Sequence, residues 1–146
     1  MLLAPLAADS VSSRAVQITL LSDDSIRLEA TPGPLTIEAP SEDRTYSPFH
    51  MLGSSIAICT FSVLYSWAEH AGLDADGLAI EVSWTFAEDP HRVGEILTRL
   101  VWPGLPPQRR AAAQRVAALC PIHGTLTHPP ALTTEVVAGA ASAVPA

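Results

Sequence analysis

The chain has 146 residues, of which 48% are hydrophobic and 16% are charged, so it can form one folded domain and is not intrinsically disordered. Its net charge is −7, with no lysine, which argues against nucleic-acid binding because phosphate contacts need concentrated positive charge. Two cysteines are too few for a disulfide scaffold, and residues 1–10 lack the positive start of a secretory signal. We therefore expect a cytoplasmic protein.

Alternating apolar and polar residues predict three short antiparallel strands near the N-terminus. They cover residues 16–21, 26–30 and 35–39, and the turn sequences SDDS and TPGP separate them. One face of this sheet should be covered and the other exposed to solvent. Residues 1–13 should form a flexible end.

Residues 47–72 predict a long helix that is apolar on every side. Ser47 can cap its first turn, Pro48 suits the first helical position, and Gly72 can end the helix in a left-handed conformation. A helix without a polar face is surrounded by protein or by lipid. Serine, threonine and glycine dilute this one, and no lysine or arginine cluster flanks it, so we expect a core helix and no membrane span.

The C-terminal half predicts two longer strands, a second helix and a last strand, at residues 78–86, 94–102, 108–119 and 133–138. The second of these strands has apolar side chains at every other position, and the helix is rich in alanine. Residues 139–146 should be another flexible end. This order of elements is typical of a single α+β domain over residues 1–146, with the long helix lying on the sheet.

The two cysteines are the candidate reactive residues. Cys59 lies in the middle of the apolar helix, and Cys120 directly follows the second helix. From the residues alone, each could be an inert core thiol, which is the usual fate of a buried cysteine, or one of a redox pair. A zinc site that combines them with His50, His123 or His128 has no paired ligand spacing to support it, so we expect no metal.

Both cysteine motifs resemble those of the OsmC/Ohr family, the osmotically inducible and organic-hydroperoxide-resistance proteins. Members of that family have a proline-led helix with a cysteine eleven positions after the proline, as Pro48 and Cys59 are here. A glycine follows that helix. After a strand pair and a second helix comes Cys-Pro with His-x-x-Leu, here CPIHGTL at residues 120–126. The resemblance covers roughly residues 15–138.

The resemblance implies an intertwined homodimer in which antiparallel sheets pack around the long central helices. It also implies that Cys59 is a peroxidatic thiolate, which attacks a small-molecule hydroperoxide, and that Cys120 resolves the resulting sulfenic acid to a disulfide. An external dithiol would then reduce the disulfide, so no bound cofactor is expected. Neither a nucleic acid nor a membrane is an expected partner.

The chain departs from the family at the position after the helix-leading proline. Organic-hydroperoxide members have a glutamate there, which orients an arginine against the thiolate, and this chain has Phe49. Candidate supporting residues are the arginines and histidines before the long helix, at its start and after the second helix: Arg14, Arg27, Arg44, His50 and His123. Each histidine could cap a helix or take part in proton transfer, and His50 could also lie at an interface. The alternative to a peroxidase is a non-enzymatic protein that binds an apolar ligand or senses redox state.

Overall fold

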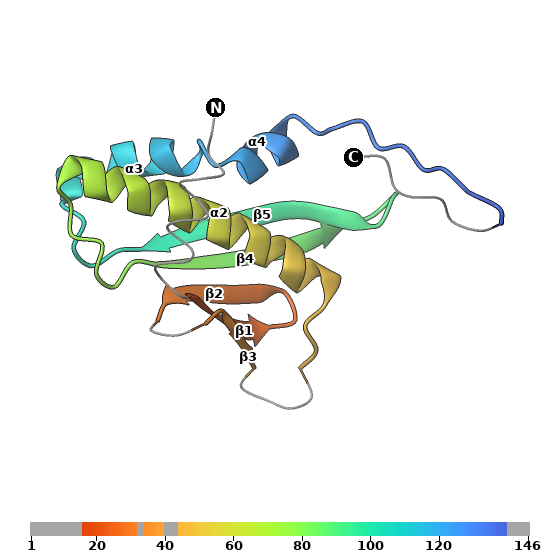
Figure 1. Ribbon diagram of the computed structural model, residues 1–146, viewed down its shortest axis with the longest axis horizontal. Coiled ribbons are helices and arrows are strands. Elements are labelled where there is room, and N and C mark those ends of the chain that lie inside the picture. Colours follow the sequence, from red (N-terminus) through yellow and green to blue (C-terminus); the bar gives the residue numbers. More distant parts are fainter. Residues whose placement is uncertain (1–15, 32–33, 40–43, 140–146) are drawn as a thin grey trace.

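The computed structural model describes residues 16–31, 34–39 and 44–139, which form a five-stranded sheet and the helices packed with it (Figure 1). The strands, in the spatial order β3-β1-β2-β4-β5, are β1 (Val16–Ser22), β2 (Ser25–Ala30), β3 (Thr36–Glu38), β4 (Ala79–Ala87) and β5 (Arg92–Val101). The helices are α2 (Pro48–Ala71), the 3-10 helix η1 (Pro107–Arg109), α3 (Arg110–Ala117) and α4 (Pro121–Thr127). α2 packs on β2 and β4, and α3 and α4 pack on α2. The predicted α+β fold, with a long helix on the sheet, is confirmed.

The N-terminal strands differ from the prediction in one pairing. β1 and β2 form the expected antiparallel hairpin, with Val16 opposite Ala30. β3 pairs with β1 in parallel, so the prediction of three antiparallel strands is wrong. Because β2 runs antiparallel to β1, it ends beside the start of β1. A strand that continues from there along the free edge of β1 runs parallel to it.

Local side-chain chemistry sets both ends of α2. The Ser47 hydroxyl accepts a hydrogen bond from the backbone N–H of His50 (3.2 Å), and the backbone N–H of Ser47 donates to Nδ1 of His50 (3.0 Å). Gly72 ends the helix in the left-handed conformation, with a φ of 66°. The predicted cap and stop are both confirmed.

α2 is the core helix of the fold. By length and composition it could cross a membrane, but 56% of its most apolar window is buried inside the structure. Its buried apolar side chains, among them Phe61 and Leu64, pack on the inward residues of three strands. These inward residues alternate along β1, β2 and β4: Val16, Ile18, Leu20, Ile26, Leu28, Ile80, Val82 and Trp84.

The elements after α2 agree with the prediction only in part. The register of β5 confirms the predicted alternation, because Ile96, Thr98 and Leu100 pair with inward residues of β4. The second helix appears as η1 and α3, and α4, which follows it, was not predicted. The predicted strand at 133–138 is wrong: this segment projects away from the sheet (Figure 1), and none of the strands in the described residues pairs with it. The predicted flexible ends lie outside the described residues, apart from Gly139.

Candidate functional site

Cys59 and Cys120 lie together where α2 meets α4. Cys59 is half-buried in the middle of α2, and Cys120 is 1% exposed at the N-cap of α4. The Cys120 thiol and the backbone N–H of Ile122 both lie close enough to the Cys59 thiol to act on its ionisation. Pro121 begins α4 directly after Cys120, and α4 packs on α2. The structure thus brings together the two cysteines that the sequence singled out.

The pKa of the Cys59 thiol is raised to about 11, first by burial and then by the hydrogen bond with Cys120. The Ile122 N–H lowers the same pKa, because a donor directed at the sulfur favours the thiolate. The thiolate is the nucleophilic form, so at neutral pH most of Cys59 is in the less reactive thiol form. The reactivity of Cys59 should therefore rise with pH.

Arg27 lies away from Cys59. It alternates along β2 with the buried Ile26, so its side chain is on the sheet face opposite α2. There it pairs with Glu81 of the neighbouring β4 at 2.6 Å. Arg14, another arginine considered from the sequence, lies outside the described residues.

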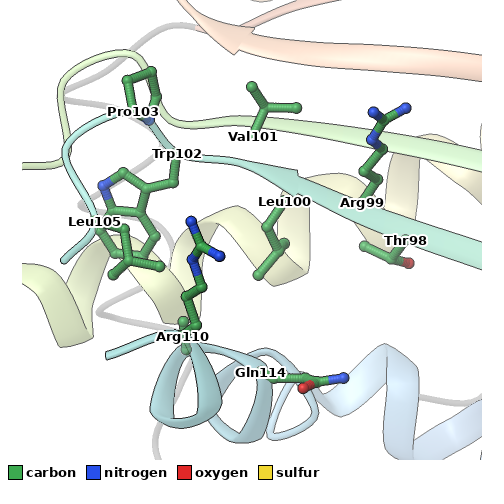
Figure 2. A pocket seen from close by; sticks show the side chains of 10 residues that line it. Thr98, Arg99, Leu100, Val101, Trp102, Pro103, Leu105, Arg110 and Gln114 are labelled. Atoms are coloured by element: carbon green, nitrogen blue, oxygen red, sulfur yellow. The ribbon is translucent and has the colours of Figure 1, made fainter. Parts of the chain in front are cut away.

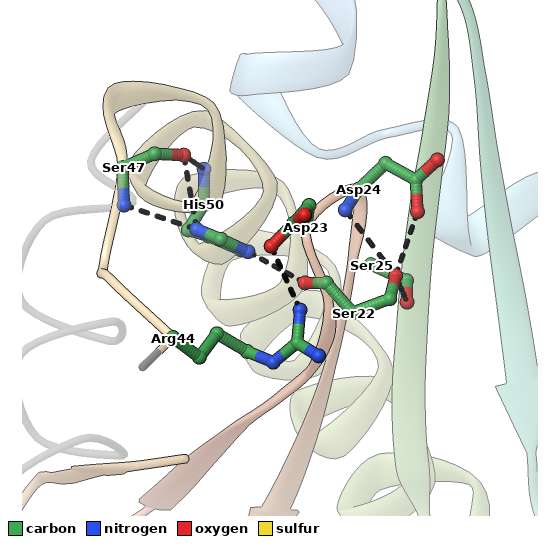
Figure 3. A network of polar contacts seen from close by, with 7 residues as sticks. All are labelled: Ser22, Asp23, Asp24, Ser25, Arg44, Ser47 and His50. Carbon is green, nitrogen blue, oxygen red and sulfur yellow. Dashed lines mark hydrogen bonds and ion pairs between the residues drawn. The ribbon is translucent and has the colours of Figure 1, made fainter. Parts of the chain in front are cut away.

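His50 links the start of α2 to the β1–β2 turn (Figure 3). It is 1% exposed, its Nδ1 accepts from the Ser47 N–H, and its Nε2 lies 2.8 Å from the Ser22 carbonyl oxygen. Since a carbonyl oxygen can only accept, Nε2 is the donor of this hydrogen bond. Arg44 pairs with Asp23 of the same turn at 2.9 Å. The geometry of both residues fits a role in holding the loop before α2 against the sheet.

We expect His50→Ala to lower the free energy of unfolding by about 2–4 kcal/mol, because it opens a cavity and leaves the Ser22 carbonyl and the Ser47 N–H without a partner. Urea unfolding measures this. His70→Ala is the matched control: His70 is an exposed histidine at the other end of α2, and its loss should cost less than about 1 kcal/mol. Equal effects of the two changes would contradict the role of His50 as a buried link.

His123 lines a cleft of about 470 Å³ between β5, α2 and the region of α3 and α4. The walls are mostly apolar and include Ile56, Ile96, Leu100, Ala117 and Leu126. Ile56 precedes Cys59 by about one helical turn, which places the cleft near the thiol pair, although neither cysteine lines it. His123 does not form the C-cap of α3, which is Ala118.

Two parts of this site were missed from the sequence: α4 and the Ile122 N–H. A proline at a first helical position is a known start signal, and Pro121 could have predicted α4. Every residue except proline has a backbone N–H, so the sequence contains no signal that predicts the contact of the Ile122 N–H with Cys59. Among the described residues, no group of three or more His, Cys, Asp or Glu side chains could hold a metal ion.

Residues 41–135 match the family model described as OsmC-like protein. The chain belongs to the OsmC-like family. A Psychrobacter arcticus 273-4 protein assigned to osmotic stress induction and the detoxification response is 19% identical, with a TM-score of 0.52 over 75% of this chain and 85% of that one. An OsmC-like hydroperoxide resistance protein of Jannaschia sp. CCS1 is 12% identical, with a TM-score of 0.53 over 82% and 89%. These two similarities show the fold. No curated protein matches the chain.

In this OsmC-like protein, the side chain at position 49 cannot reach Cys59 of its own chain. The two positions are ten residues apart on α2, which is about 15 Å along the helix axis. Phe49 packs edge-on against Phe86 of β4, with ring centroids 4.9 Å apart. A residue at position 49 can act on a Cys59 thiol only if that thiol belongs to another chain.

Proposed function

We propose that this OsmC-like protein is a cysteine-based peroxidase that reduces organic hydroperoxides, with Cys59 as the peroxidatic residue and Cys120 as the resolving residue. The juxtaposition of the two thiols, close enough for Cys120 to act on the ionisation of Cys59, carries the proposal. A sulfenic acid formed on Cys59 would have the thiol that resolves it already in contact. Membership of the OsmC-like family and the fold shared with a hydroperoxide resistance protein support the same class of reaction.

The reaction has three steps. The Cys59 thiolate attacks the terminal oxygen of the hydroperoxide, the O–O bond breaks, and the alkoxide takes up a proton and leaves as an alcohol. Cys120 then attacks the sulfur of the Cys59 sulfenic acid, which releases water and forms a disulfide. An external dithiol reduces this disulfide by exchange and is itself oxidised to a disulfide. His123, which lines the adjoining cleft, is a candidate donor of the proton to the alkoxide.

The cleft beside the thiols supports an organic substrate over hydrogen peroxide. Its walls are mostly aliphatic, and its volume of about 470 Å³ is within the range of small-molecule pockets. An alkyl or aryl group of the hydroperoxide would bury apolar surface there, whereas hydrogen peroxide has no such group to bury.

Steady-state consumption of cumene hydroperoxide, with dithiothreitol as the dithiol, tests the proposal. We expect turnover at a rate proportional to protein concentration, and a larger kcat/KM for cumene hydroperoxide than for hydrogen peroxide. Consumption no faster than with dithiothreitol alone, at neutral and at alkaline pH, would overturn the peroxidase assignment.

A second candidate function is the binding of an apolar ligand without catalysis, and the pKa of Cys59 favours it. With that pKa at about 11, little thiolate exists at neutral pH. A binding protein of this kind would keep both thiols reduced in excess hydroperoxide, which separates it from the peroxidase.

We also propose that the protein is a homodimer, because apolar side chains of one chain stay exposed. Met51 on α2 is 54% exposed, and in the segment after α4 Leu132 and Val136 are 92% and 91% exposed. Exposed apolar side chains gathered on one segment are typical of surfaces that a partner covers. Within the described residues no strand pairs with this segment, so its backbone could add a strand to a second copy.

Light scattering should give twice the chain mass at micromolar concentration. Val136→Asp should raise the monomer fraction, since it would bury a charge at the interface, whereas Glu135→Ala next to it should not. A monomer mass for the wild-type protein would contradict the dimer.

A further inference from the structure

A second cleft, of about 730 Å³, lies between the end of β5 and α3 (Figure 2). One wall is apolar and includes Leu100, Trp102, Leu105 and Ala113. The indole N–H of Trp102 donates to the Asp74 carbonyl oxygen at 2.7 Å, which fixes the ring in that wall. The volume and the apolar lining are those of a small-molecule pocket.

Arg110 is the charged group available to a ligand in this cleft. It is the first residue of α3, and Figure 2 shows its side chain directed from α3 toward the space beside Leu100 and Trp102. In the part of the chain that the structure describes, Arg110 has no ion pair. Arg99 also contributes to the lining, but its guanidinium points away from Arg110 and lies 3.8 Å from Glu81.

The charges of the side chains around Arg110 favour an anionic ligand. None of the described residues that line the cleft is acidic, although the whole chain carries a net charge of −7. A single guanidinium matches one carboxylate through two parallel N–H···O bonds. A doubly charged phosphate would need a second cation beside it, and the other arginine of the lining, Arg99, is directed away from Arg110 and toward Glu81. The aliphatic and aromatic wall next to Arg110 would cover an apolar group attached to the carboxylate.

We propose that this cleft binds an aliphatic carboxylate, with the carboxylate on Arg110 and the hydrocarbon chain along Leu100, Trp102 and Leu105. The cleft shares Thr98, Leu100 and Gln114 with the cleft beside the thiol pair, so a hydrocarbon chain can continue along the inner face of β5. The proposal concerns binding alone. It does not depend on whether Cys59 reduces a hydroperoxide.

Isothermal titration of the full chain with dodecanoate tests this site. We expect saturable binding of one dodecanoate per chain, and weaker binding of dodecanol, which has the same chain length without the charge. Arg110→Gln should weaken dodecanoate binding by about tenfold or more and leave dodecanol binding unchanged. Arg109→Gln is the matched control, since Arg109 is an exposed neighbour that does not line the cleft, and it should change neither.

A variant of the apolar wall tests the other half of the site. Leu105→Ser should weaken the binding of both dodecanoate and dodecanol, because it removes apolar contact area from each. No saturable binding of dodecanoate would overturn the proposal, and so would equal losses in Arg110→Gln and Arg109→Gln. Tighter Arg110-dependent binding of dodecyl phosphate than of dodecanoate would overturn the choice of a carboxylate.

Discussion

Cys59→Ser should abolish hydroperoxide consumption, and Cys120→Ser should stop it after a single turnover. Without the Cys59 sulfur there is no nucleophile for the O–O bond. Without Cys120 the sulfenic acid forms, and its resolving thiol is missing. The first change should lower the rate to that of dithiothreitol alone. The second should leave one equivalent of alcohol per chain and a sulfenic acid that a dimedone probe labels at Cys59.

The two serine variants also separate this mechanism from its alternatives. Equal multiple turnover in wild type and Cys120→Ser would show that an external thiol resolves Cys59 and that Cys120 is not needed. Activity that survives Cys59→Ser would remove Cys59 from the reaction altogether. Either serine is close in size to the thiol that it replaces, so both variants should fold, and circular dichroism provides the check.

The rate of Cys59 oxidation should rise steeply with pH. The pKa of Cys59 is about 11, so the thiolate fraction, and with it the rate constant, should increase about a hundredfold from pH 7 to pH 9. The rise should continue until the pH passes that pKa. Stopped-flow tryptophan fluorescence with excess cumene hydroperoxide measures the rate constant. A rate that does not change between pH 6 and pH 9 would contradict the assigned thiol form.

The same pH profile tests the effect of the Ile122 N–H on the pKa of Cys59. Replacing the peptide bond before Ile122 by an ester removes this donor and leaves the side chain in place. Because the donor lowers the pKa of Cys59, its loss should raise that pKa and slow oxidation at pH 8 by about tenfold. The ester should cost α4 little stability, since the first N–H groups of a helix have no partner inside it. Ile122→Val keeps the amide and should behave as wild type.

How far the sequence predicts this fold depends on whether the determining contact is local. The ends of α2 follow from Ser47, Pro48 and Gly72, which lie beside the ends that they set, and both were predicted correctly. The parallel pairing of β3 depends on which strand edge is free, and the pattern of LTIEA carries no such information. Residues 133–138 have the sequence pattern of a strand. A strand also needs a neighbouring strand to pair with, and a local pattern does not predict whether one is present.

In the candidate site, too, local features could be predicted from the sequence and contacts between distant segments could not. The motifs single out Cys59 and Cys120, but their juxtaposition depends on the packing of α4 against α2. The position of Arg27 was available from the sequence, because it alternates with Ile26 along a strand and therefore faces away from the helix. The capping role of His50 is local, whereas its bond to the Ser22 carbonyl joins distant segments.

The most direct test of the central claim is to count free thiols after adding one equivalent of cumene hydroperoxide per reduced chain. At pH 9, where more Cys59 is thiolate, we expect both thiols to disappear together and mass spectrometry to find one disulfide between Cys59 and Cys120 of the same chain. Two free thiols per chain after prolonged exposure to excess hydroperoxide would contradict the claim that these cysteines are a redox pair.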